Sequence, residues 1–224
     1  MSVLIVVNNL NHGRYLPKSL ESIREQNATV LGIDAGSTDD SLDAYERFRV
    51  PVIHCKGLNQ PRSLNKVLSF TRADYFAWIN ADDAYLPNFL SSHLEAFADH
   101  PEADIVYSDW LQCDERTSDS DVPRKPRNLR ESFERGRNPL VHPTTVIRWS
   151  LFDRIGLFDE TISFPFDFEF WCRAWFRGIQ FHYIPEPTAW WRIHLDSLSA
   201  KRGDAIREEL GRIRKMYRGT PCTA

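Results

Sequence analysis

The hydrophobic positions in the first half of the chain form short unbroken runs, separated by longer amphipathic segments. Runs such as residues 3–7 and 75–79 are typical of strands that are buried on both faces of a parallel sheet. Segments such as residues 15–26 carry apolar residues on one face only, which predicts surface helices. The predicted strands are residues 3–7, 30–33, 50–54, 75–79 and 105–107, and the predicted helices are residues 15–26, one after the turn at 34–37, one from 61 and one from 87 to about 98. This alternation predicts a single-domain α/β fold, with a doubly wound, mostly parallel sheet and helices on both of its faces.

The second half of the chain has a different pattern. Residues 114–139 are mostly polar and are interrupted by proline and glycine, which predicts a long loop. Further along, the pattern predicts an apolar segment at 144–149, an aromatic helix at 167–177, two short strands at 180–184 and 188–193, and a final helix at 204–217.

Composition and charge argue against several classes of protein. The 28 basic and 31 acidic residues among 224 give a net charge of −3, which argues against a nucleic-acid-binding protein. No apolar run approaches the ~20 residues that span a bilayer, and the N-terminus has no basic region or cleavage site of a secretory signal. We therefore expect a cytoplasmic protein with reduced thiols, because the four cysteines are too scattered for a zinc site or a disulfide framework. They are Cys55, Cys113, Cys172 and Cys222.

Acidic residues follow two of the predicted strands. Asp34 follows the strand at 30–33, and Asp82 and Asp83 follow the strand at 75–79. Ligands of open parallel sheets bind beyond the carboxyl ends of the strands. Adjacent carboxylates repel each other unless a cation lies beside them, and Mg²⁺ or Mn²⁺ would supply that cation at a phosphate-binding site. Alternatively, the pair caps the helix that begins near Pro87 or forms a solvated turn, and the spacing alone leaves both interpretations open.

Seven motifs occur in order along the chain, from Ser2 to about Ser199. They are HGRYLPKSLESIREQ, IDAGSTDDS, SLNKVL, FAWINADDAYLPN with HPEADIVYSD, VHPTTVIRWSLFDRIGLFDE, FDFEFWCRAWFRG and WRIHLDSLS. With these motifs the chain resembles the family 2 glycosyltransferases of the GT-A fold. The resemblance implies an inverting transferase that moves a sugar from a UDP-, GDP- or dTDP-sugar to a hydroxyl acceptor, such as a polysaccharide, a lipopolysaccharide or a lipid-linked oligosaccharide.

The resemblance also implies a metal site on the donor diphosphate. In the family, the motif that stands here as Asn80-Ala81-Asp82-Asp83 holds Mg²⁺ or Mn²⁺, and we name both Asp82 and Asp83 as candidate ligands. Asn80 stands where many members carry Asp and is a candidate for donor contact. His194 matches a position near the diphosphate where an imidazole ligates the metal or donates to a phosphate, although a surface role is the alternative.

Further residues match positions that contact the donor in the family. Asn9 lies in the first-strand motif, where Leu10 replaces the aromatic ring that packs on the base. Asp34 is a candidate for ribose or base contact, or else stabilises a turn, and Ala35 replaces the carboxylate that often reads a uracil. Two further donor candidates lie near the start of the helix from residue 61: Arg62, which is otherwise a solvated helix arginine, and Asn65. Asp109 and His142 are candidates for holding substrate hydroxyls or for purely structural roles.

Asp167 in FDFEFW matches the position of the general base in the family. Its aromatic neighbours would raise its pKa toward neutrality, which suits a group that takes the acceptor proton. One displacement with one base inverts the anomeric centre without a covalent intermediate. Asp167 also suits the N-cap of the aromatic helix, and the two roles are compatible. Glu169 lies four residues before Arg173, the spacing of an ion pair within a helix.

We divide the domain into residues 1–110, expected to bind the nucleotide-sugar, residues 111–200, expected to bind the acceptor and carry the base, and a C-terminal helix and tail at 201–224. The helix is basic on its polar side and flanks, which suits peripheral contact with anionic lipid, but a helix packed on its own domain is simpler and preferred. Its basic residues are Lys201, Arg202, Arg207, Arg212, Arg214, Lys215 and Arg218. A second group of basic residues lies in the predicted loop. It could bind an anionic acceptor or membrane headgroups, or the loop could simply be solvated. These residues are Arg124, Lys125, Arg127, Arg130, Arg135 and Arg137.

Two rival functions stay open. A sugar nucleotidyltransferase on a similar sheet would release pyrophosphate and would have no need of Asp167. A non-catalytic nucleotide-sugar-binding module would explain the departures at Leu10, Ala35 and Asn80. The intact carboxylates of the two acidic motifs favour an enzyme over that module.

Overall fold

The computed structural model describes residues 1–115, 117, 119–197, 201 and 203–220, so Ser199, Arg202 and Cys222 lie outside the described residues. Nine strands form one curled sheet in the order β3-β2-β1-β4-β8-β6-β9-β5, with β7 paired to β6 outside this path. The strands are β1 (Val3–Asn9), β2 (Thr29–Asp34), β3 (Val52–His54), β4 (Tyr75–Asn80), β5 (Ala84–Tyr85), β6 (Ile105–Asp114), β7 (Asp119–Arg124), β8 (Thr145–Arg148) and β9 (Phe181–Ile193).

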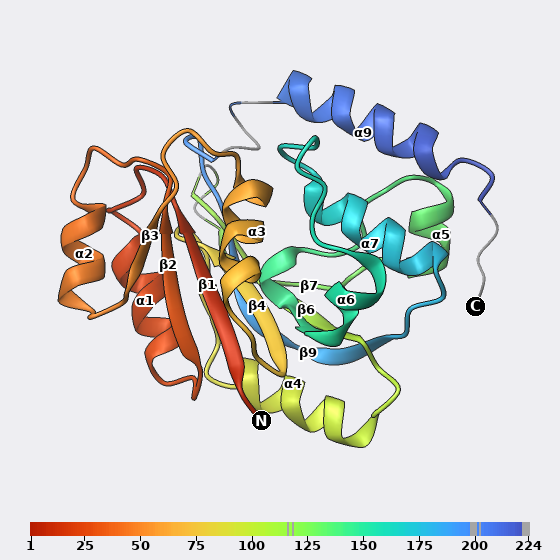
Figure 1. Ribbon diagram of the computed structural model, residues 1–224, viewed down its shortest axis with the longest axis horizontal. Helices are drawn as coiled ribbons and strands as arrows, with labels where there is room; N and C mark the ends of the chain where they lie inside the picture. The colour runs from red at the N-terminus through yellow and green to blue at the C-terminus, as the bar shows by residue number, and fades with distance from the viewer. Residues whose placement is uncertain (116, 118, 198–200, 202, 221–224) are drawn as a thin grey trace.

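Helices cover both faces of this sheet (Figure 1). They are α1 (Leu16–Arg24), α2 (Ser41–Arg47), α3 (Gln60–Phe70), α4 (Phe89–Asp99), α5 (Leu129–Glu134), α6 (Ser150–Ile155), α7 (Phe166–Phe176), α9 (Gly203–Tyr217) and the 3-10 turn η1 (His142–Thr144). Strands β1 to β4 pair in parallel, as the apolar runs predict, and β6 pairs in parallel with β9. The antiparallel pairs all involve β5, β7 or β8.

Strand alternation sends side chains into two separate cores. Leu4 and Val6 of β1 pack with α3 and α7, whereas Val3, Ile5 and Val7 pack with α1, α2 and α4. All seven residues of β1 are buried, which explains the unbroken apolar run at residues 3–7; the last two residues, Asn8 and Asn9, are polar. The α3 and α7 side holds most of the buried aromatic residues.

The segment at 114–139 differs from the predicted loop. Strand β6 continues to Asp114 and turns back into β7, with Trp110 opposite Arg124. Helix α5 follows, capped by the Asn128 side chain, which accepts a hydrogen bond from the backbone N–H of Glu131. Phe133 anchors α5 in the core at 3% exposure. The prediction of a loop was wrong because neither element has a repeating apolar pattern in its sequence. Strand β7 lies at the edge of the sheet, and α5 has a single large buried side chain, Phe133.

The two strands predicted at 180–184 and 188–193 are one strand, β9. Its register against β6 shifts around Asp109, where Pro185 and Pro187 fall on the β9 side. Proline has no backbone N–H to donate, so the ladder accommodates the two prolines with an irregularity rather than by ending the strand. The strand therefore runs from the aromatic core to the far end of the sheet, where the polar site begins.

Helix α9 packs against α7, as preferred from the sequence. Ile213 is fully buried, and the Tyr217 ring stacks on Phe176 at 5.4 Å between centroids. The Tyr217 hydroxyl also donates a hydrogen bond to Glu169 Oε1 (2.7 Å), and Glu169 forms the predicted ion pair with Arg173 (2.8 Å). Among the described residues, no helix combines the length and apolar character needed to cross a bilayer.

Candidate active site at the carboxyl ends of the parallel strands

The ends of β1, β2 and β4 bring the predicted polar residues together. The sheet register pairs Asn9 with Asp34 and Asn8 with Asn80. The side-chain amide of Asn9 donates hydrogen bonds to Asp34 Oδ2 (3.3 Å) and Ser37 Oγ (3.0 Å). Asn9 and Asp34 therefore form one polar unit at the edge where an open parallel sheet binds its ligand.

Asp34 is held in a tight turn. Its Oδ1 accepts hydrogen bonds from the backbone N–H groups of Gly36 and Ser37, both at 2.9 Å. Burial alone would raise the pKa of Asp34, but the hydrogen bonds from Ser37, Gly36 and Asn9 keep this pKa below its ordinary value. Asp34 therefore stabilises this turn, as one of the two predicted roles requires. Its contact with a donor stays a prediction.

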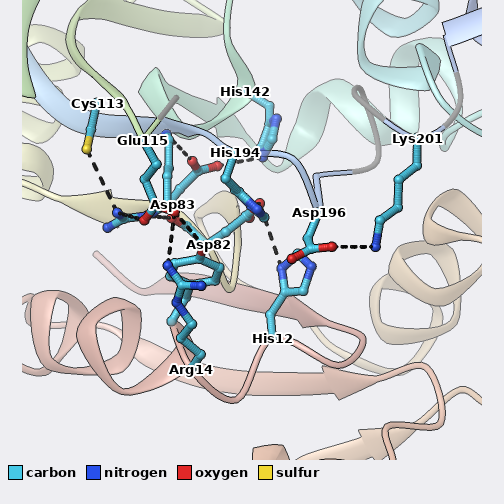
Figure 2. A network of polar contacts seen from close by, with 12 residues as sticks. His12, Arg14, Asp82, Asp83, Cys113, Glu115, His142, His194, Asp196 and Lys201 are labelled. Atoms are coloured by element: carbon cyan, nitrogen blue, oxygen red, sulfur yellow. Dashed lines mark hydrogen bonds and ion pairs between the residues drawn. The ribbon is translucent and has the colours of Figure 1, made fainter. Parts of the chain in front are cut away.

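Two histidines from distant parts of the chain lie close to the Asp82 carboxylate (Figure 2). Asp82 Oδ2 lies 2.9 Å from His194 Nε2 and 3.7 Å from His12 Nδ1. His12 precedes α1, Asp82 follows β4, and His194 follows β9. One ligand atom from each residue lies within 4.8 Å of the others, which is the spacing of a metal-binding group.

The donor set of this group fits a divalent transition metal. Burial lowers the pKa of His12, although the Asp82 carboxylate opposes this effect, so the neutral imidazole needed by a metal is favoured. His194 Nδ1 is buried without a hydrogen-bond partner among the described residues. Two imidazoles with one carboxylate suit Mn²⁺ better than Mg²⁺, because Mg²⁺ prefers ligand sets made of oxygen.

Asp82 and Asp83 are neighbours with different surroundings. Burial would raise the pKa of Asp82, but the hydrogen bond from His194 and the nearby His12 lower it. Burial and the Asp82 charge raise the pKa of Asp83 well above its ordinary value. Asp83 Oδ1 accepts the backbone N–H of Arg192 (2.9 Å), so this side chain lies against β9 rather than in the group of Asp82, His194 and His12.

Arg192 forms the wall beside Asp82. Its Nε donates to the Asp82 carbonyl oxygen (2.9 Å), and its Nη1 donates to Glu115 Oε1 (2.9 Å). Its guanidinium lies 5.0 Å from the centroid of the Tyr15 ring, and the Tyr15 hydroxyl donates to Glu115 Oε2 (2.8 Å). This network fixes the turn that carries Asp82 against α1 and β9.

His12 and Arg192 were missed as functional candidates in the sequence. Both lie inside the motifs that carry the family resemblance, HGRYLPKSLESIREQ and WRIHLDSLS, so a signal was available. No local pattern places residue 12 beside residue 194, because that proximity depends on the position of β9 in the sheet.

Asp167 lies in the first turn of α7, partly buried among aromatic residues. Its Oδ1 accepts the backbone N–H of Phe168 (2.7 Å), and its Oδ2 accepts the side-chain amide of Asn138 (3.3 Å). Burial raises its pKa to about 6, and these hydrogen bonds only partly offset that rise. The helix begins at Phe166 with Pro165 as its N-cap, so the predicted N-cap role of Asp167 is wrong.

Helix α9 holds the segment that leads to Asp167. Glu209 accepts hydrogen bonds from the backbone N–H groups of Ser163 and Phe164, both at 2.9 Å. Replacing Glu209 with Ala would leave two N–H groups unpaired, so we expect the free energy of unfolding to fall by about 1–3 kcal/mol. Urea unfolding checks this, with Glu208→Ala on the exposed side of α9 as the matched control. An equal effect of the two substitutions would contradict the bracing role of Glu209.

Arg62 and Asn65 both contact the loop before α7. Arg62 is exposed, and its Nε lies 3.5 Å from Glu160 Oε2. The Asn65 side chain donates to the Phe158 carbonyl oxygen (2.9 Å) and accepts the Phe158 N–H (3.1 Å). The contact of Arg62 with a diphosphate stays a prediction, and a donor role of Asn65 requires its bonds to Phe158 to open.

Three other candidates have structural partners. Asn80 Oδ1 accepts a hydrogen bond from Gln60 Nε2 (2.6 Å). The His142 ring stacks on Trp78 with centroids 5.4 Å apart, and burial lowers its pKa to about 4. The Tyr183 hydroxyl donates a hydrogen bond to Asp109. Contacts of these residues with a substrate stay predictions.

Comparison with known proteins places this geometry in a family. The sequence profile described as "Glycosyl transferase family 2" matches residues 2–155. An uncharacterized glycosyltransferase of Rickettsia prowazekii is 24% identical over 204 residues, which cover 86% of this chain and 64% of the relative. The S. aureus TarS fragment 1-349 superimposes with a TM-score of 0.72 at 17% identity, covering 96% of this chain and 65% of that chain.

A mannosyltransferase from Pyrobaculum calidifontis, PcManGT, was solved in complex with GDP-Man and Mn²⁺. It superimposes with a TM-score of 0.70 at 15% identity, covering 96% of this chain and 63% of that chain. This chain therefore spans somewhat less than two thirds of the length of these proteins. The two superpositions confirm the GT-A fold, and the profile match over 154 of 224 residues shows that the chain belongs to glycosyltransferase family 2.

Proposed function

We propose that this protein is a metal-dependent, inverting glycosyltransferase that moves a sugar from a nucleotide-diphosphate donor to a hydroxyl acceptor. The observation that carries the proposal is the group of Asp82, His194 and His12 at the carboxyl end of β4, beside the polar unit of Asn9 and Asp34. A divalent metal and a nucleotide would thus bind side by side at the carboxyl ends of β1, β2 and β4.

The proposed donor is a nucleotide-diphosphate sugar. Family membership supports this, as do the structural neighbours: TarS was solved with UDP-GlcNAc and with UDP, and PcManGT with GDP-Man. In this chain, Asn9 and Asp34 would contact the nucleoside, with Asn80 and Asn65 nearby as further donor contacts. Arg62 would meet the diphosphate from α3, where its guanidinium is exposed.

Asp82, His194 and His12 would hold the metal, which we propose is Mn²⁺ or Mg²⁺, whereas the neighbouring Asp83 accepts the backbone N–H of Arg192. When bound, the metal supplies positive charge next to the departing diphosphate. The chain's contribution is to lower the pKa values of Asp82 and His12, which favours the carboxylate and the neutral His12 imidazole, and to fix the Asp82 turn through Arg192. His12 also links this site to the start of α1, because its carbonyl oxygen accepts the backbone N–H groups of Tyr15 and Leu16.

Asp167 is the proposed general base. The acceptor oxygen forms a bond to the anomeric carbon as the bond from that carbon to the diphosphate oxygen breaks, and Asp167 takes the hydroxyl proton. A single displacement of this kind inverts the anomeric configuration. With a pKa of about 6, Asp167 is mostly ionised at neutral pH yet more basic than an exposed aspartate. The proposed acceptor is a saccharide or a lipid-linked saccharide.

Thermal unfolding with nucleotides tests the donor and metal parts of the proposal. UDP, GDP, dTDP and CMP are each added with Mn²⁺ or with a chelator. A ligand at 100 times its Kd stabilises the protein by about 2.7 kcal/mol, so one diphosphate should raise the melting midpoint by a few degrees, and chelation should abolish the shift. His12→Ala should weaken Mn²⁺ about 10- to 100-fold, because a metal ligand is lost. His54→Ala, an exposed histidine at the end of β3, is the matched control.

The outcomes separate the proposal from its rivals. A metal-dependent shift with one diphosphate, together with transfer of its sugar and release of that diphosphate, is expected. Release of pyrophosphate from a nucleoside triphosphate would instead identify a nucleotidyltransferase. Nucleotide binding without transfer to any acceptor would identify a binding module. No shift with any nucleotide would contradict the proposed donor site.

A further inference from the structure

A cavity of about 550 Å³ lies beside α7, and none of its lining residues belongs to the Asp82 group. Residues 125–130, which include the first residues of α5, form one wall, and residues of β6, β9 and α7 form the others. Six of the lining residues carry its chemistry: Lys125, Arg127, Arg130, Tyr107, Trp175 and Tyr183. This volume is within the range of small-molecule binding sites.

The first wall carries three positive charges. Lys125, Arg127 and Arg130 are exposed, and none of them forms an ion pair with a described residue. Glu131, a nearby acidic residue, is instead paired with Arg135 at 2.9 Å. Three cations around one cavity repel each other, and an anion between them would relieve that repulsion.

The opposite walls are aromatic. The rings of Tyr107 and Tyr183 lie 5.4 Å apart with 29° between their planes, and Trp175 packs against Phe133 (5.3 Å) and Phe181 (6.1 Å). Flat, rigid rings with a polar edge stack on the apolar faces of sugar rings. Tyr107 adds a hydroxyl with no hydrogen bond to any described residue, which is a free donor and acceptor for a sugar hydroxyl.

The cavity and the proposed base share helix α7, which carries both Trp175 and Asp167. Trp175 follows Asp167 by eight residues of α7, which corresponds to about 12 Å along the helix axis. The segment that forms the basic wall continues through α5 to Asn138, whose amide contacts Asp167 (3.3 Å). Helix α7 and the segment from Lys125 to Asn138 thus each link the cavity wall to the residues around Asp167.

We propose that the cavity binds an inner unit of an acidic oligosaccharide acceptor, one that carries phosphate or carboxylate groups, while the end of the acceptor reaches Asp167. The three cations bind the anionic group, and Tyr107, Tyr183 and Trp175 contact the sugar rings. This proposal rests on the proposed transferase function and names its acceptor class.

Charge reversal in the cavity tests the proposal. Arg127→Glu/Arg130→Glu changes two exposed residues of the basic wall, and Arg24→Glu/Arg47→Glu makes the same change in net charge on α1 and α2. Calorimetry at low salt measures binding of tetragalacturonate, phosphorylated mannopentaose and neutral mannopentaose. The unmodified protein should bind at least one charged probe about tenfold or more tightly than the neutral one. The cavity variant should lose that preference, and the control should stay within about twofold of the unmodified protein.

The other outcomes are decisive as well. A preference for tetragalacturonate or for the phosphorylated probe identifies which anionic group is recognised. Equal binding of charged and neutral probes, absence of binding, or equal losses in the cavity variant and its control would overturn the proposal. Binding to phosphatidylglycerol vesicles that needs the same two arginines, without glycan binding, would also overturn it in favour of a membrane contact. The shift in melting midpoint caused by nucleotide with Mn²⁺ should be the same in the cavity variant as in the unmodified protein. If the unmodified protein shows no such shift, the result contradicts the proposed transferase function rather than the acceptor class.

Discussion

Asp82→Asn is expected to abolish Mn²⁺-dependent nucleotide binding and to lower kcat/KM for sugar transfer by about 10³-fold or more. The substitution keeps the size of the side chain but removes the charge that lies 2.9 Å from His194 and 3.7 Å from His12. The metal would then be left with two neutral imidazoles, which hold a divalent cation poorly without an anionic ligand. Calorimetric titration with Mn²⁺ and a transfer assay measure the two effects.

Asp83→Asn is the matched control for that substitution. Asp83 Oδ1 accepts the backbone N–H of Arg192, and the carbonyl oxygen of an asparagine can accept the same hydrogen bond. We therefore expect the affinity for Mn²⁺ to change only a few-fold in this variant. If Asp83→Asn loses the metal and Asp82→Asn retains it, the assignment of the ligand to Asp82 is wrong.

Asp167→Asn is expected to lower the rate of transfer by about 10²- to 10⁴-fold while nucleotide binding with Mn²⁺ stays near that of the unmodified protein. The amide can keep the hydrogen bond from Phe168 but cannot take a proton from the acceptor. In the unmodified protein, the rate should rise as the pH increases through about 6 and the carboxyl group loses its proton. Retained transfer in this variant would show that the base lies elsewhere.

The same substitution should make the protein more stable at alkaline pH. The pKa of Asp167 is raised from 3.8 to about 6, so the folded state binds the proton more tightly than the unfolded state. The contribution of Asp167 to the free energy of unfolding therefore falls as the pH rises from about 4 to about 6, and stays low above that. Asp167→Asn should gain about 1–3 kcal/mol at pH 8 and little at pH 4. Urea unfolding at both pH values checks this, with the exposed Asp43→Asn as control; equal changes at both pH values would argue against a raised pKa.

The parallel part of the sheet could be predicted because its pattern is local. Strands buried on both faces must be continuously apolar, and the runs at 3–7 and 75–79 are the central strands β1 and β4. Strand β7 and helix α5 could not be predicted in the same way. One is an edge strand, and the other depends on Phe133, so neither has a repeating apolar pattern.

The residues of the candidate site could be predicted where they lie within a family motif. Asp82, His194 and Asp167 each lie in a family motif, and the structure places the first two in contact. His12 is a different case, since its motif also opens a helix and gives no sign of a partner 182 positions further along. The donor contact of Asn65 stays a prediction, because nothing in the sequence indicates that its side chain pairs with the backbone of Phe158, 93 positions further along.

The position of β9 has a consequence for how the protein is made. This strand is translated after the other strands of the described sheet, yet it lies inside the sheet between β6 and β5. Until it emerges, the nascent chain presents unpaired strand edges, which are the kind that aggregate or recruit chaperones. His194 emerges just behind β9, whereas Asp82 is translated more than a hundred residues earlier. We therefore expect the proposed binding of Mn²⁺ to require that β9 has already paired with β6 and β5.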